Sequence, residues 1–209
     1  MSLLPPEVHS ALSQLLSGLS TADNTIRSQA EEQLNNDWIQ NRPDVLLMGL
    51  AEQLEGAEST MTRSFAAVLF RRIATKTRKD PVTNEAKELF STLNHEQKLI
   101  IRQKLVACLT NESANDVRRK IGDAVAEIAR QYTDNGDQWP ELLGILFQAS
   151  QSPEAGLRET AFRIFSTTPS IIEKPHEDAV LGVFGKKIKD EVVSVCIQLL
   201  VASTGFDDI

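Results

Sequence analysis

Apolar residues recur along this chain at the spacing of one face of an α-helix. The pattern is clearest between residues 115 and 132, where four apolar side chains follow at steps of four, four and three. This spacing places them on one side of a helix. The four are Val117, Ile121, Val125 and Ile128. We expect the charged residues between them on the solvent side: Arg118, Arg119, Lys120, Asp123, Glu127 and Arg130.

The same periodicity predicts nine further helices, which makes five consecutive antiparallel pairs. The pairs are expected at residues 6–38, 43–75, 95–132, 140–167 and 177–202. Asn94 and Gln97 are spaced as a capping box at the start of the fifth helix. Residues 76–93 are polar and contain Pro81, so they indicate a long connection with one short helical turn. Since no stretch alternates apolar and polar residues between turn signals, we expect an all-α fold without strands.

The second helices of the five pairs can be superimposed on one another. An arginine recurs at the same position in four of them, and a serine replaces it in the last: Arg27, Arg63, Arg118, Arg158 and Ser194. The spacings between these residues are 36, 55, 40 and 36. A helix-pair period near 40 is typical of a HEAT-repeat solenoid, an α-α superhelix whose stacked pairs bury a continuous core. The alternative is an ordinary helical bundle with coincidental spacing.

Charge and cysteine usage narrow the class of protein. The 209 residues carry a net charge of −7, so the chain lacks the basic surface that nucleic-acid binding requires. Cys108 and Cys196 lie in separate apolar runs, and three histidines are scattered along the chain. This spacing fits neither a zinc site nor a disulfide framework. We expect two core cysteines in a reducing compartment. A signal peptide and a membrane-spanning run are not evident either.

No set of residues suggests catalysis. The adjacent carboxylates Glu31 and Glu32 have the pattern of a solvated helix surface, not of an acid–base pair. Residues 182–187 contain two glycines and two lysines, but their spacing and their position after a helix do not fit a phosphate-binding loop. We therefore expect a binding protein that is not an enzyme and needs no metal or cofactor.

Several motifs carry a resemblance to a known family. They lie at residues 30–38, 65–72, 116–129 and 139–143. In this order and spacing they resemble the N-terminal segment of the karyopherins, the importin-β family, and most of all its importin subunit beta-3 type. An importin-β N-terminal-type region falls at about residues 25–75. Family members are several-fold longer, which leaves open whether this chain is a fragment or a natural truncation.

The resemblance implies a nuclear transport receptor that acts in the cytoplasm, the nucleus and the nuclear pore. Inner helices of the family hold the GTPase Ran in its GTP form, outer helices contact phenylalanine-glycine repeats of nucleoporins, and later repeats hold protein cargo. Carried to this chain, the candidate Ran-binding residues are Glu31, Arg63, Arg71, Asp123 and Glu127. On the fourth helix we expect Ala67 on the same face as Arg63 and Arg71, and the following residues on the apolar side: Met61, Phe65, Val68, Leu69 and Ile73. The alternatives are a HEAT-repeat scaffold for an unrelated protein or peptide and, for each residue singly, a solvated helix face.

Overall fold

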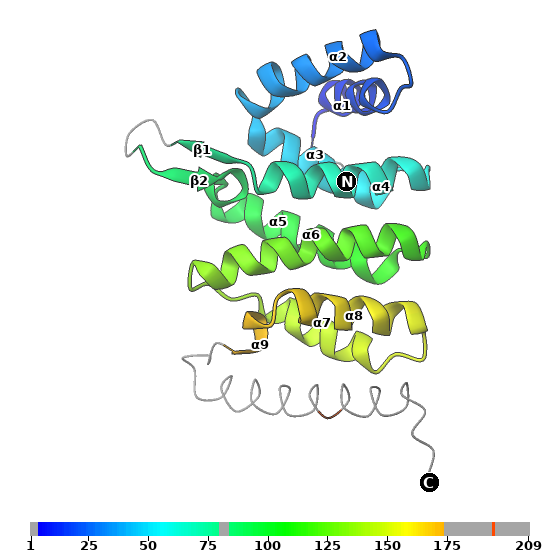
Figure 1. Cartoon of the computed structure of the whole chain (residues 1–209), viewed down its shortest axis with the longest axis vertical. Coiled ribbons are helices and arrows are strands. Elements are labelled where there is room, and N and C mark those ends of the chain that lie inside the picture. The colour runs from blue at the N-terminus through cyan, green and yellow to red at the C-terminus, as the bar shows by residue number, and fades with distance from the viewer. Residues whose placement is uncertain (1–3, 80–83, 174–193, 195–209) are drawn as a thin grey trace. The chain divides into compact units, whose positions relative to one another are not determined.

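Helices make up nearly all the regular structure of this chain. The structure is a computed structural model that describes residues 4–79, 84–173 and 194 (Figure 1). It divides into two units, one ending at Ile128 and one beginning at Ala129. The first contains α1 (Pro6–Leu19), α2 (Asn24–Gln33), the π-helix η1 (Leu34–Ile39), α3 (Pro43–Gly56), α4 (Thr60–Ala74), β1 (Thr77–Lys79), β2 (Ala86–Glu88), the 3-10 helix η2 (Leu89–Thr92), α5 (His95–Asn111) and most of α6 (Asn115–Asp134). The second contains the end of α6, then α7 (Pro140–Ser150), α8 (Ala155–Thr167) and α9 (Ser170–Glu173).

Consecutive helices form pairs. In the described residues α1 packs on α2, α3 on α4 and α7 on α8, and a short turn joins α5 to α6. A repeated helical fold is therefore confirmed. The expected number of five pairs is more than the described residues show, because they contain four pairs and the four-residue helix α9. The fifth pair predicted at 177–202 lies outside the described residues.

The expectation of no strands is wrong. β1 pairs with β2 in antiparallel register, with Thr77 opposite Glu88, Arg78 opposite Lys87 and Lys79 opposite Ala86. These strands have three residues each and are almost fully exposed, so they lack the apolar alternation by which half-buried strands are recognised. The expected helical turn follows them as η2.

Sequence periodicity located the core correctly on α6. Val117, Ile121, Val125 and Ile128 are all buried. Elsewhere in the first unit the largest fully buried side chains include Trp38, Phe70 and Phe90, and in the second unit Leu142, Leu146 and Ile164 are fully buried. Burying one such side chain contributes about 1.5–3 kcal/mol to folding.

The solvent side of α4 differs from the predicted one. Ala67, expected on the surface, is completely buried, whereas Met61 and Val68 are 73% and 43% exposed. The reason is that α4 packs through a second apolar stripe, which comprises Ala66, Leu69, Phe70 and Ile73. Both stripes have helical spacing, and only the position of α3 and the other neighbouring helices decides which of them faces the core.

Three helices of the first unit, α2, α4 and α5, begin with a side-chain cap. The Asp23 side chain accepts hydrogen bonds from two backbone N–H groups of α2, and Ser59 accepts one from α4. At α5, the Asn94 side chain accepts from the Gln97 N–H while the Gln97 side chain accepts from the Asn94 N–H. The predicted capping box is therefore confirmed.

Candidate partner-binding surface

The recurrent arginine closes the turn within each described helix pair. Arg63 and Arg158 each donate from Nη1 to the carbonyl six residues earlier, at 2.8 Å, and to the next carbonyl as well. Arg118 donates from Nε to the Glu112 carbonyl at 2.8 Å, again six residues earlier. Arg27 makes the corresponding contact to the Thr21 carbonyl at 3.5 Å. The arginine recurs because it satisfies carbonyls that the turn leaves without helical partners.

Two of these arginines are not surface charges. Arg118, expected on the solvent side of α6, is buried. Arg63, expected on the partner-binding side of α4, forms a bidentate ion pair with Glu112, at 2.7 Å from Nε to Oε2 and 3.1 Å from Nη2 to Oε1. The side chains are only 16% and 4% exposed.

Glu112 is held as a carboxylate by several donors. The Arg63 guanidinium lowers the pKa of its side chain below the ordinary range, and the Ala114 N–H adds to this effect with a 2.9 Å hydrogen bond, although burial opposes both. Glu112 therefore links the turn before α4 to the turn before α6. We leave Arg63 out of the binding surface for this reason.

The remaining charged candidates on α4 and α6 lie together. Arg71 Nη1 lies 3.5 Å from Asp123 Oδ2, and these side chains are 48% and 24% exposed. Lys120 donates through Nζ to Ser64 Oγ, which makes a second contact between the two helices. Glu127 lies one turn beyond Asp123 and is half-buried. We define the α4–α6 surface as the following six residues, of which Val68 is apolar: Ser64, Val68, Arg71, Lys120, Asp123 and Glu127.

Glu31 lies apart from this surface. It is exposed on α2, and no contact recorded among residues 4–79 and 84–173 joins its side chain to α4 or α6. The structure therefore brings Arg71 and Asp123 into contact, places Glu127 next to Asp123, and leaves Glu31 and Arg63 elsewhere. Sequence reasoning missed Ser64 and Val68, since the solvent side of α4 depends on its neighbours. It placed Lys120 on the solvent side of α6 but did not select it as a binding candidate.

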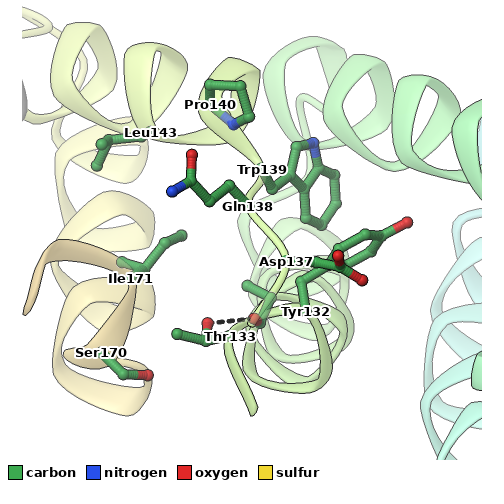
Figure 2. A pocket seen from close by; sticks show the side chains of 10 residues that line it. Tyr132, Thr133, Asp137, Gln138, Trp139, Pro140, Leu143, Ser170 and Ile171 are labelled. Atoms are coloured by element: carbon green, nitrogen blue, oxygen red, sulfur yellow. Dashed lines mark hydrogen bonds between the residues drawn. The ribbon is translucent and has the colours of Figure 1, made fainter. Parts of the chain in front are cut away.

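The hollows in the described residues differ widely in volume and include one of about 20 Å³ and one of about 640 Å³. Figure 2 shows one in the second unit, where Tyr132 and Thr133 of α6 lie near Trp139, Leu143 and Ile171. Its volume is about 20 Å³, enough for one water molecule. The Thr133 hydroxyl donates to the Ala129 carbonyl at 2.6 Å.

Residues with reactive or ligating side chains are not assembled into a centre in the described part of the chain. Burial raises the pKa of Cys108 to about 12, which keeps its thiol protonated and unreactive at neutral pH. Residues 4–79 and 84–173 contain no cluster of His, Cys, Asp or Glu that could hold a metal ion. None of the helices in these ranges is both long and apolar enough to span a membrane.

Comparisons with known proteins identify relatives. The family model described as "IPO5-like, TPR repeats" matches residues 113–206. Importin subunit beta-3 of Saccharomyces cerevisiae is 33% identical over 99% of this chain and 19% of its own length. A probable importin-5 homolog of Dictyostelium discoideum is 25% identical over 94% of this chain and 18% of its own length. The chain thus spans about a fifth of these relatives.

Solved structures give the same result. Kap121p bound to RanGTP is similar to this chain with a TM-score of 0.70 and 34% identity, over 82% of this chain and 15% of Kap121p. Kap121p bound to Nup53p matches with a TM-score of 0.69 and 36% identity, over 81% and 15%. Together with the repeated helix pairs, these similarities show that the chain belongs to the karyopherin (importin-β) family and is similar to the N-terminal segment of importin subunit beta-3.

Proposed function

We propose that this chain is the N-terminal part of a nuclear import receptor and that it binds Ran in its GTP form. The observation that carries the proposal is the likeness to Kap121p in its complex with RanGTP, at 34% identity over 82% of this chain. The role is binding without catalysis, in a protein that moves between cytoplasm and nucleus through the pore.

The α4–α6 surface is the part of the chain that we assign to Ran. Its charges stand on two helices that are fixed by a buried core, so binding requires little ordering of the backbone. The Arg71–Asp123 pair is partly exposed, and surface pairs of this kind contribute about 0–1 kcal/mol to stability. A charged group of a partner can therefore take the place of Arg71 or Asp123 in this ion pair at little cost in stability. Val68 supplies an apolar contact between the charges.

Other partners are assigned to other parts of the receptor. The first helices of the pairs, α1, α3, α5 and α7, are the candidates for phenylalanine-glycine repeats of nucleoporins. The related Kap121p has been solved with Nup53p, which supports a nucleoporin as a partner of the receptor without indicating the helices that bind it. Protein cargo is expected on repeats that follow in the longer receptor.

Calorimetric titration with Ran in both nucleotide forms tests the Ran assignment. We expect Ran loaded with a GTP analogue to bind at least about tenfold more tightly than Ran·GDP, a difference of about 1.4 kcal/mol. The affinity should be lower than that of a full-length receptor, because the contacts of later repeats are absent. Equal binding of both forms, or none, contradicts the proposal.

Charge reversal tests where Ran binds. The double variant Asp123→Lys/Glu127→Lys should weaken binding of Ran·GTP by at least about tenfold, since both carboxylates lie in the proposed surface. Glu96→Lys/Glu141→Lys, which changes the charge equally at exposed positions of α5 and α7, is the control and should bind normally. Unchanged binding by the first variant with unchanged helicity would assign Ran to another surface.

A further inference from the structure

A groove separate from the α4–α6 surface lies between the π-helix η1 and strand β1. Its volume is about 400 Å³, and all its lining residues belong to the first unit. One side is formed by Asn35, Ile39, Gln40 and Asn41, and the other by Lys76, Thr77, Arg78 and Leu89. The hairpin of β1 and β2 projects beyond the end of α4 in Figure 1. A π-helix is rare and is frequently found at functional sites.

The lining has the chemistry of an anion-binding site, although the chain as a whole has a charge of −7. It contains two cations, three side-chain amides and one hydroxyl, and none of its eight residues is a carboxylate. Lys76 donates to Asn35 Oδ1 at 3.3 Å and Arg78 to the Gln40 carbonyl at 2.9 Å. In the described part of the chain, both cations thus have neutral acceptors and no ion-pair partner.

The register of the hairpin places a further positive charge opposite Arg78, outside the lining of the groove. Arg78 lies directly opposite Lys87 in the β1–β2 pairing, and both side chains are exposed. Like charges directly opposite each other destabilise an antiparallel pair. The ion pair of Lys87 with Glu85 is exposed and relieves this repulsion only in part. An anion between the strands and η1 would relieve it further and would form charge-assisted hydrogen bonds, which are stronger than those to neutral acceptors.

Apolar residues define the base of the groove. Ile39 and Leu89 line it but are only 9% and 1% exposed, so they close the base of the groove and leave contact with a ligand to its polar and cationic rim. A simple inorganic anion would fill only a small part of the groove's volume of about 400 Å³. The phosphates of a nucleic acid would continue beyond the groove and be repelled by the rest of the chain, which has a net negative charge.

We propose that this groove binds an acidic peptide segment of a partner protein. Carboxylates of the segment bind Lys76 and Arg78, and the amides of Asn35, Gln40 and Asn41 hold its backbone. The site is independent of the Ran assignment, because it shares no residue with the α4–α6 surface.

Fluorescence anisotropy on the whole chain tests the proposal. The probe is a dye-labelled peptide of alternating Glu and Asp, and its counterpart carries Gln and Asn instead. We expect the acidic peptide to bind at least about tenfold more tightly than the neutral one, and added salt to weaken binding because the charges are exposed. Equal binding of the two peptides overturns the proposal.

Variants locate the binding site. Lys76→Gln/Arg78→Gln should weaken binding of the acidic peptide by at least about tenfold, whereas Arg78→Lys, which keeps the charge, should retain most of it. The control Arg119→Gln/Arg163→Gln removes the same charge from exposed positions on α6 and α8 and should bind normally. Equal losses in the control and the first variant would show attraction by net charge alone and overturn the assignment to the groove. Tighter binding of a single-stranded oligonucleotide of equal charge, lost in the same variant, would overturn the choice of a peptide.

Discussion

Arg63 stabilises two successive turns at once. It donates to the carbonyls of Ala57 and Glu58 in its own turn and to the carboxylate of Glu112 in the turn of the next pair. We expect Arg63→Ala to lower the free energy of unfolding by about 2–3 kcal/mol, because the mutation leaves a nearly buried carboxylate without its main partner. Urea denaturation followed by circular dichroism measures this change.

A surface arginine provides the control for Arg63. Arg119 forms an ion pair with Asp116 one turn away, and both side chains are well exposed. Arg119→Ala should therefore change stability by no more than about 0.5 kcal/mol. Equal losses in the two variants would contradict the structural role of Arg63.

The same ion pair makes stability depend on pH. Arg63 is the main cause of the lowered pKa of Glu112, which lies below its ordinary value of 4.5. The ionised pair therefore stabilises the folded state at pH values above 4.5. The gain is lost as pH falls through the lowered pKa of the folded state. We expect the stability difference between the wild type and Glu112→Gln to be largest near neutral pH and to shrink below pH 4.5.

Urea denaturation at several pH values measures this difference. In an Arg63→Ala background, Glu112→Gln should have a much weaker pH-dependent effect, because the main cause of the lowered pKa is absent. A difference that stays constant from neutral to acidic pH would contradict the assignment of this pKa shift to the Arg63–Glu112 pair.

Among the elements, α5 begins with the most complete cap. The two side chains of its capping box satisfy two backbone N–H groups, and Gln97 also donates to Asp44 Oδ2 at 3.0 Å, which connects α5 to the start of α3. Asn94→Ala should cost about 1 kcal/mol. Gln103→Ala, at an exposed position within the same helix, should cost less than about 0.5 kcal/mol. Thermal unfolding of both variants tests the difference.

How far the sequence predicts an element depends on what the element packs against. The apolar stripe of α6 was predictable because a single stripe of helical spacing is present there. On α4 two stripes compete, so Met61 and Val68 were assigned to the wrong side. The β1–β2 hairpin gave no sequence signal, since its short strands bury almost nothing.

The candidate surface could also be predicted only in part from the sequence. Arg71 and Asp123 were both selected from the sequence, and the structure places them 3.5 Å apart although 52 positions separate them. The recurrence of arginine at 27, 63, 118 and 158 was also visible in the sequence. Its role was not, because the carbonyls that it contacts are backbone atoms of turns without a shared motif.

For the molecule as a whole, a repeated fold implies that stability is mostly local. In the first unit α1 contacts α3 and α4, and α3 contacts α5, so the stability of this unit is close to a sum of pair stabilities and of interfaces between adjacent pairs. The recurrent arginines allow a comparison of the two kinds of contribution. Arg158 donates only to Ser152 and Pro153 of its own turn among the contacts recorded for the described residues, whereas Arg63 also binds Glu112 of the next pair.

Hydrogen exchange followed by mass spectrometry distinguishes these contributions. Arg158→Ala should raise exchange rates in α7 and α8 by roughly fivefold, which corresponds to about 1 kcal/mol, and leave α1 to α5 unchanged. Arg63→Ala should raise them in α3, α4, α5 and the start of α6 together, because it removes a contact between two pairs. Uniform acceleration along the chain by either variant would mean that the pairs unfold as one cooperative unit. Acceleration limited to α3 and α4 in Arg63→Ala would mean that the ion pair with Glu112 does not couple adjacent pairs.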